Sequence, residues 1–163
     1  MRKTSLTISG RLCLFGEHTD WVSGYRRINS AINPGRAIVC LVDLNISADI
    51  EKKDDFSFYT DIKSLGVQCN ATEDSINMSI VSNPYFAYVL STYLYIYKKY
   101  QVKGLKIQIT TNNLYIGKGL GSSAAICILV ARAFNNIYNL RMSIEDEIEA
   151  AYWGGEKYEI AMW

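Results

Sequence analysis

The sequence has little of what marks a metal centre, a disulfide framework or a membrane anchor. Its 163 residues include one histidine, two prolines and four cysteines. The cysteines are widely spaced and form no Cys-x-x-Cys or Cys/His pattern, so we expect free thiols, most of them buried. No apolar run approaches the roughly 20 residues of a membrane span, and the N-terminus has no signal-peptide core. We therefore expect a cytoplasmic protein without a membrane partner.

Neither sign of charge is in excess. Seventeen Lys and Arg stand against 16 Asp and Glu, for a net charge of +1, so the electrostatic footprint of a nucleic-acid binder is missing. The 49% apolar and 20% charged composition is typical of a globular domain with a core. Because there is no repeat or linker, we expect one domain. Nothing in the sequence indicates an oligomeric state.

The first half of the chain favours strands and the second half favours helices. We expect strands over 11–15, 25–32, 36–50, 55–60 and 105–112, a weaker strand at 75–81, and a loop that includes 63–68. Apolar residues recur at helical spacing from Pro84 to about Tyr100 and from Ser122 to about Tyr138. A final helix is expected from an N-cap at Ser143 to about Trp153. This order predicts an α+β fold.

The first chemically informative stretch is the glycine-rich segment IGKGLGSSAA, residues 116–125. Gly117, Gly119 and Gly121 lead into the start of a helix at Ser122. Because glycine has no Cβ, the backbone can approach an anion closely, and the first-turn N–H groups and helix dipole attract phosphate. The same pattern is also compatible with an ordinary strand-to-helix turn that Ser122 caps.

Two familiar phosphate loops are excluded at this segment. A Walker A loop needs lysine after its last glycine, and here Lys118 lies between glycines. The dinucleotide fingerprint needs a third glycine where this chain has Ser122. Ser122 and Ser123 favour a phosphate site, because adjacent hydroxyls at a helix start can ligate a nucleotide-bound Mg²⁺.

A second unusual stretch, GEHTD, follows the strand at 11–15, which we expect to be buried. Glu17, His18 and Asp20 could together bind a small polar ligand such as a hydroxyl compound. They are equally compatible with a solvated turn. Zinc is disfavoured, because one histidine without nearby cysteine leaves too few ligands. Arg11, on the strand itself, could be functional or an edge-strand arginine.

Together, GRLCLFGEHTDWVSGYR and IGKGLGSSAA resemble the first two signature motifs of the GHMP kinases, the superfamily of galactokinase and of homoserine, mevalonate and phosphomevalonate kinases. The resemblance covers about residues 9–156. The first motif is similar to that of galactokinase-like sugar kinases, whereas mevalonate-type members carry lysine in place of Arg11. It implies the GHMP N-terminal domain, a ribosomal protein S5 domain 2-like α+β fold with a left-handed β-α-β unit. The implied activity is ATP-dependent phosphorylation of a monosaccharide hydroxyl.

The resemblance also implies a role for individual residues. Arg11 would lie near the attacking hydroxyl and the transferred phosphoryl group. The sugar-binding residues would be Glu17, His18, Asp20 and Tyr25. The residues that wrap the ATP phosphates would be Gly117, Lys118, Gly119, Leu120, Gly121, Ser122, Ser123 and Ala124. Ser122 or Ser123 would help hold Mg²⁺. One departure is Tyr115, where the family commonly has proline.

The end of the sequence departs further. Galactokinase-like enzymes continue from A-Y-x-G-E into C-G-x-M-D-Q, whose aspartate is catalytic, and this sequence has neither that segment nor the family's C-terminal domain. With one choice of codons for residues 157–163, a one-base shift spells Asn-Thr-Lys-Ser-Gln-Cys-Gly, close to the residues that lead into that segment. The extra glycine in AYWGGE points the same way. We therefore expect residues 1–156 to be a partial GHMP domain and 157–163 to be a tail foreign to the family, produced by a frameshift.

Such a fragment is expected to retain parts of the ATP and sugar sites and to be inactive. Three alternatives remain open from the sequence. The parent could be a mevalonate-type kinase, or the chain could be a non-catalytic sensor that binds sugar and ATP. It could also be an inert product whose helices leave apolar faces uncovered, such as that of residues 125–134.

Overall fold

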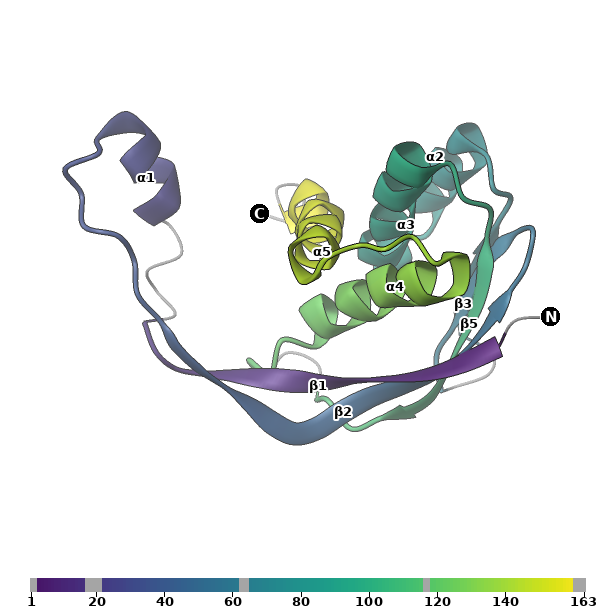
Figure 1. Cartoon of the computed structure of the whole chain (residues 1–163), viewed down its shortest axis with the longest axis horizontal. Coiled ribbons are helices and arrows are strands. Elements are labelled where there is room, and N and C mark those ends of the chain that lie inside the picture. The colour runs from purple at the N-terminus through teal and green to yellow at the C-terminus, as the bar shows by residue number, and fades with distance from the viewer. Residues whose placement is uncertain (1–2, 17–21, 62–64, 116–117, 160–163) are drawn as a thin grey trace.

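The computed structural model describes residues 3–16, 22–61, 65–115 and 118–159. It has a single five-stranded sheet with helices packed on one face (Figure 1). In chain order the elements are β1 (Lys3–Phe15), α1 (Val22–Ile28), β2 (Ile38–Lys52), β3 (Phe56–Tyr59), β4 (Gly66–Cys69), α2 (Glu73–Ser82), η2 (Pro84–Phe86), α3 (Ala87–Tyr100), β5 (Leu105–Asn112), α4 (Ser122–Tyr138) and α5 (Ile144–Glu159). The predicted α+β class is confirmed.

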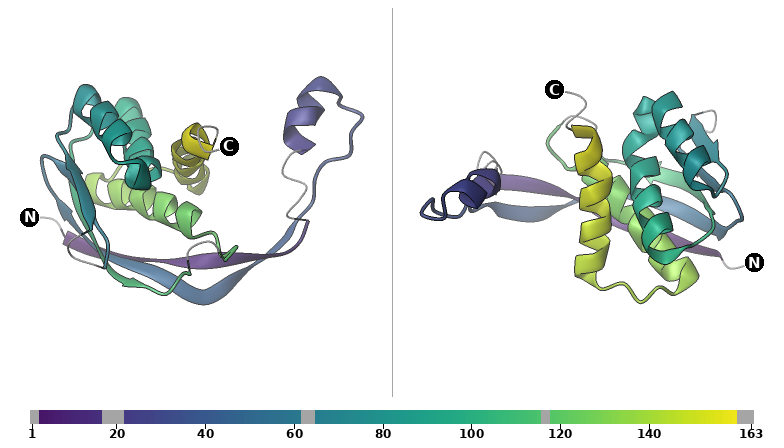
Figure 2. Two further views of the ribbon diagram at one scale, coloured as in Figure 1. Left: turned by 180° about the vertical axis from the view of Figure 1, so that it is seen from behind. Right: turned by 90° about the horizontal axis from the view of Figure 1, so that it is seen from above.

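The sheet is mixed, with strand order β1-β2-β5-β3-β4. All neighbouring pairs are antiparallel except β3 and β5, which run parallel. The strands β1 and β2 are much longer than the others and continue beyond the helical layer as a two-stranded arm that leads to α1 (Figures 1 and 2). We call this projection, residues 11–16 and 22–41, the arm.

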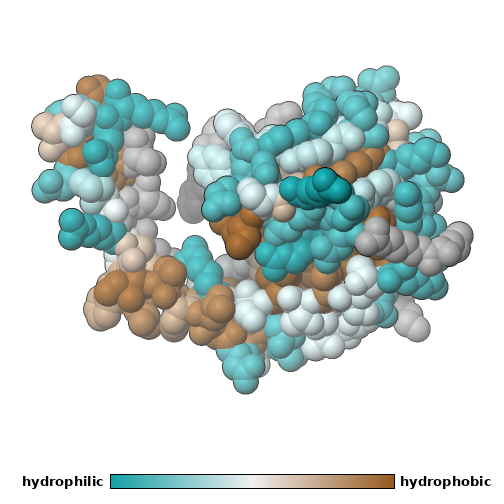
Figure 3. Space-filling model, viewed as in Figure 1, coloured by the Kyte–Doolittle hydropathy of each residue, from teal (hydrophilic) through white to brown (hydrophobic). Residues whose placement is uncertain are grey.

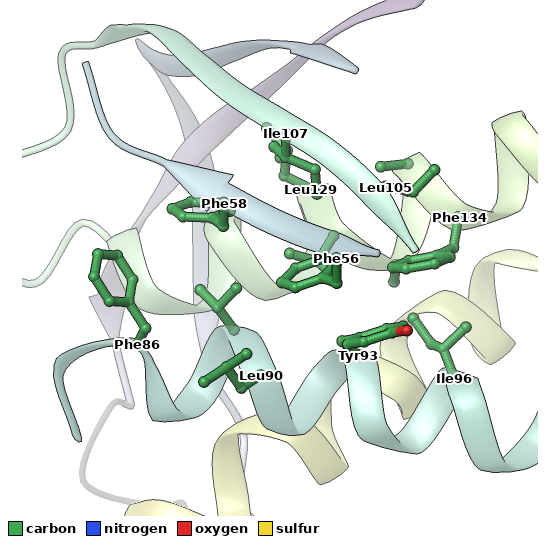
Figure 4. Packing of buried hydrophobic residues seen from close by; sticks show 14 of the residues in the cluster. Phe56, Phe58, Phe86, Leu90, Tyr93, Ile96, Leu105, Ile107, Leu129 and Phe134 are labelled. Atoms are coloured by element: carbon green, nitrogen blue, oxygen red, sulfur yellow. The ribbon is translucent and has the colours of Figure 1, made fainter. Parts of the chain in front are cut away.

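An aromatic stack fills the centre of the core between the sheet and the helices (Figure 4). The ring of Tyr93 on α3 stacks on Phe56 of β3, with centroids 4.4 Å apart, and on Phe134 of α4, with centroids 5.2 Å apart, and the two phenylalanine rings lie 6.1 Å from each other. All three side chains are fully buried. Buried aromatic side chains contribute a large share of core stability, so this stack fixes α3 and α4 against the short strands.

Two predicted strands are helices. The segment expected as a strand at 25–32 contains the end of α1, and the weaker candidate at 75–81 lies inside α2. The Thr72 hydroxyl caps α2 by accepting a hydrogen bond from the Ser75 N–H at 3.3 Å. Ile76 and Ile80, one turn apart, are the buried residues of that helix. Residues 66–68, expected within a loop, belong to β4.

The last helix begins as predicted and ends later than predicted. The Ser143 hydroxyl accepts a hydrogen bond from the Asp146 N–H at 3.1 Å, and the Asp146 carboxylate accepts one from the Ser143 N–H at 3.0 Å. This reciprocal cap confirms the predicted N-cap. The helix does not stop near Trp153 but runs through Gly154 to Glu159.

Exposure of apolar side chains corrects two further expectations. The strand segment at 11–15 is not buried, because it lies on the arm, where Phe15 is 71% exposed. The apolar face of residues 125–134 is not uncovered, because Leu129, Val130 and Phe134 are fully buried under the sheet and neighbouring helices. Figure 3 shows apolar side chains gathered instead over the arm. The exposed apolar residues of the arm are Leu12, Leu14, Phe15, Tyr25, Ile28, Ile38, Val39 and Leu41.

The cysteines are free, as expected, and two of the four are buried. Cys69 and Cys127 lie in the core, Cys13 is half-buried and Cys40 is exposed on the arm. Burial raises the pKa of the Cys69 and Cys127 thiols to about 11, because the charged thiolate loses its hydration. Among the described residues, no helix is long and apolar enough to cross a membrane.

Candidate functional site

The structure brings Arg11 of β1 against the glycine-rich loop that precedes α4. The Arg11 backbone N–H donates a hydrogen bond to the Leu120 carbonyl at 3.0 Å. The Arg11 side chain passes beside Gly121, where an added Cβ would lie 3.1 Å from the Arg11 Cγ. Two motifs that lie far apart in the sequence are therefore in direct contact.

The loop adopts a backbone that favours glycine. Gly119 has a φ of +71° and Gly121 a φ of +66°, both in the left-handed region. A Cβ at Gly119 would meet no atom of the described residues within 4 Å, so none of them fills the space beside it. At Gly119 and Gly121 the loop therefore has no side chains, and its backbone is accessible to a ligand beside Gly119 as far as the described residues show.

The N-terminus of α4 carries no cap from a side chain. Gly121, rather than Ser122, is the N-cap residue, and no side-chain cap hydrogen bond is formed there. The alternative interpretation of Ser122 as the cap is therefore wrong. The first bond of the helix runs from the Ala125 N–H to the Gly121 carbonyl at 2.9 Å. The N–H groups of Ser122, Ser123 and Ala124 have no partner within the helix and lie at its positive end.

The charges around this helix end favour an anion. The first turn of α4 contains no acidic residue, and Arg11 and Lys118 are both exposed. Free N–H groups at a helix N-terminus, together with a guanidinium, form a site that suits phosphate oxygens. The chemistry available here is binding of a phosphate group and neutralisation of its charge.

A metal ion would find few ligands of its own in this region. Among the described residues, no group of three or more His, Cys, Asp or Glu side chains could hold one. Ser122 is half-buried and Ser123 is exposed, and each offers one hydroxyl oxygen. Such oxygens suit Mg²⁺ that is already coordinated by phosphate, because Mg²⁺ is usually bound by few protein ligands plus phosphates and water.

Of the predicted sugar-binding residues, the structure describes only Tyr25. Glu17, His18 and Asp20 lie outside the described residues, as does Gly117 of the loop. Tyr25 lies on α1, which is at the far end of the arm from α4 in all three views (Figures 1 and 2).

Glycines of the first motif have structural roles that sequence reasoning missed. Gly16 has a φ of +86°, and a Cβ there would lie 1.9 Å from the Arg36 carbonyl oxygen, so only glycine fits where β1 ends. Gly10, which precedes Arg11, is buried under the glycine-rich loop. A glycine inside an apolar strand is a signal of close backbone approach that could have found it.

Comparison with known proteins finds similarity to kinases, in agreement with a phosphate site at the N-terminus of α4. Residues 87–160 match the family described as the GHMP kinases N terminal domain. The matched stretch contains the glycine-rich loop and all of α4. It is 29% identical over 154 residues to a galactokinase of Thermosipho africanus (strain TCF52B), covering 89% of this chain and 38% of that protein. It is also 29% identical over 142 residues to a galactokinase of Pyrococcus furiosus, covering 87% of this chain and 36% of that protein.

Solved structures share the fold of this chain. The mevalonate kinase of Methanococcus jannaschii superposes with a TM-score of 0.75 at 24% identity, over 98% of this chain and 47% of that one. The galactokinase of Lactococcus lactis, complexed with galactose, gives 0.75 at 18% identity, over 96% of this chain and 38% of that one. The resemblance of the two motifs to the GHMP kinases is therefore confirmed. The chain spans less than half the length of these relatives.

Proposed function

We propose that this chain supplies the nucleotide-binding half of an ATP-dependent kinase that phosphorylates a hydroxyl of a monosaccharide. The observation that carries the proposal is the contact between Arg11 and the uncapped N-terminus of α4. The galactokinase relatives and the galactokinase-like first motif support a sugar as the acceptor. Within this proposal, residues 1–156 form the kinase domain.

The proposed chemistry is an in-line phosphoryl transfer. The acceptor hydroxyl oxygen bonds to the γ-phosphorus, the bond from that phosphorus to the bridging oxygen breaks, ADP leaves, and the hydroxyl proton passes to a base. Charge that develops on the phosphoryl oxygens is stabilised by the N–H groups of Ser122, Ser123 and Ala124 and by the Arg11 guanidinium. When bound with the nucleotide, Mg²⁺ would neutralise phosphate charge beside the hydroxyls of Ser122 and Ser123.

The acceptor side of the proposal rests on the first motif. We propose that Glu17, His18, Asp20 and Tyr25 bind sugar hydroxyls, since carboxylate and imidazole groups suit such partners. The proposed base is the aspartate of the family's C-G-x-M-D-Q segment, which this sequence does not contain. We therefore propose that the 163-residue chain binds ATP without turning it over.

Nucleotide titration tests the ATP site. The chain should bind Mg·ATP saturably in calorimetry, and Arg11→Ala should weaken binding by about tenfold or more, because a charge-assisted hydrogen bond contributes about 1.5–3 kcal/mol. The matched control is Arg141→Ala, which removes an exposed arginine beyond the opposite end of α4 and should leave the affinity unchanged. Absence of ATP binding by the unmodified chain would refute the proposal.

Acceptor binding separates the sugar from a second candidate. The fold similarity to mevalonate kinase supports a mevalonate-type substrate as the alternative. Titration with galactose, other monosaccharides and mevalonate should show saturable binding of a monosaccharide, and preference for mevalonate would reverse the assignment. Release of ADP by this chain with any acceptor would show that the missing aspartate is dispensable.

A further inference from the structure

The glycine-rich loop and β1 meet where the strand has no side chain. Gly10 is buried, and a Cβ there would lie 2.3 Å from the Leu114 Cδ2 and 3.1 Å from the Leu120 carbonyl oxygen. The register of the β1–β2 pair also shifts between Ser9 and Arg11. This irregularity and the missing side chain let the loop main chain reach the strand, where the Arg11 N–H binds the Leu120 carbonyl.

The glycine-rich loop also lacks a side chain where it contacts β1, because Gly121 lies beside Arg11. A Cβ on Gly121 would lie 3.1 Å from the Arg11 Cγ, 3.5 Å from its Nε and 3.9 Å from its Cδ. The stem of Arg11 therefore lies along Gly121, directly beside the first turn of α4. Gly119 has nearly the same φ, but a Cβ added there would meet no atom of the described residues within 4 Å. The contact with Arg11 therefore belongs to Gly121 and not to every glycine of this loop.

We propose that Gly10 and Gly121 are positioning residues, which together hold the Arg11 guanidinium in register with the phosphate-binding N–H groups of α4. We call the pair the notch. The inference rests on the proposed function, and it adds that the two glycines affect nucleotide affinity through the position of Arg11. Donors aimed at a phosphate act most strongly when they are held in place before the ligand arrives, and small displacements weaken them. A side chain in the notch should therefore weaken nucleotide binding through Arg11.

The two loop glycines provide a matched test. Gly119→Ala and Gly121→Ala introduce the same backbone strain, because both positions are left-handed, but only the second places a methyl group against Arg11. We expect Gly119→Ala to weaken Mg·ATP binding by up to about tenfold, because the strained backbone displaces the phosphate-binding N–H groups of the loop and helix end. Gly121→Ala should weaken it by at least about threefold more, since residues in contact couple measurably.

Making Gly119→Ala and Gly121→Ala in an Arg11→Ala chain tests whether the difference between them depends on the Arg11 side chain. Without the Arg11 side chain, the two alanine variants should bind Mg·ATP with equal affinity, because only the strain remains. A difference that persists in this background, or equal affinities in the presence of Arg11, would overturn the proposal. Backbone strain alone would lower the affinity equally with and without the Arg11 side chain. A difference that depends on Arg11 therefore cannot come from a general loss of stability. Gly155→Ala, in α5 with no atom within 4 Å, is the control and should bind like the unmodified chain.

A second measurement keeps the notch separate from the kinase proposal. If the unmodified chain binds no ATP, the proposed function fails, and with it the role of the notch in nucleotide binding. Unfolding midpoints of the same four variants then test the contact that the inference requires. Gly121→Ala should unfold at a lower temperature than Gly119→Ala with Arg11 present, and at the same temperature without it. Equal midpoints with Arg11 present would refute the contact itself.

Discussion

Gly154 and Gly155 are neighbours in α5, yet alanine at these two positions should change stability in opposite directions. Gly154 faces α3, where an added Cβ would lie 2.0 Å from the Thr92 Oγ1, 2.7 Å from its Cα and 2.8 Å from its Cβ. Gly155 faces away, and an added Cβ would meet no atom within 4 Å. The pair thus tests how closely the last helix packs on the core.

The magnitudes follow from two effects. Alanine stabilises a helix interior by about 0.5–1 kcal/mol relative to glycine, and at Gly155 this gain should be the whole effect. At Gly154 the new methyl group would overlap the backbone of α3, and such overpacking costs about 1–3 kcal/mol or more. Gly154→Ala should therefore lower the free energy of unfolding by about 1–2 kcal/mol after the helix gain is subtracted.

Thermal and urea unfolding, followed by circular dichroism at 222 nm, measure both variants. A difference of about 1.5–3 kcal/mol between them corresponds to midpoints separated by about 3–12 °C in a chain of this size. Thr92→Ala in the Gly154→Ala chain removes the nearest clashing atom but leaves the Cα and Cβ contacts, so it should restore part of the loss. Equal stabilities of the two glycine variants would refute the close packing of α5 on Thr92.

Two further predictions concern the buried groups. Glu147 is 5% exposed and accepts hydrogen bonds from Arg132 Nε at 2.9 Å and Asn135 Nδ2 at 2.8 Å. Glu147→Ala should therefore lower the free energy of unfolding, measured in urea, by about 2–4 kcal/mol. A loss below about 1 kcal/mol would contradict this hydrogen-bond network. A thiol reagent at neutral to mildly basic pH should label exposed Cys40 readily and Cys127 only after unfolding. Burial shields the Cys127 thiol and raises its pKa to about 11, so that almost none of it is thiolate at the pH of the assay. Rapid labelling of Cys127 in the native chain would contradict its burial.

Elements with long and consistent periodicity were predictable. The bounds of β5 at 105–112 and of α4 at 122–138 agree with the sequence prediction, because strict alternation and a continuous apolar helix face each fit one structure. The short segments at 25–32 and 75–81 fit a strand pattern as well as a helix pattern. For the second of these, the Thr72 cap and the burial of Ile76 and Ile80 against the core decided in favour of a helix.

The sequence by itself determined the chemistry of the site: a glycine-rich loop before a helix, two serines and an arginine in a separate motif. Those properties are local, since they depend on residue type and spacing along a few residues. Only the tertiary structure placed Arg11 beside Gly121, left Gly10 without room for a side chain and pressed Gly154 onto Thr92. Each of these depends on contacts between elements far apart in the chain, which strand register and helix packing set and no local pattern encodes.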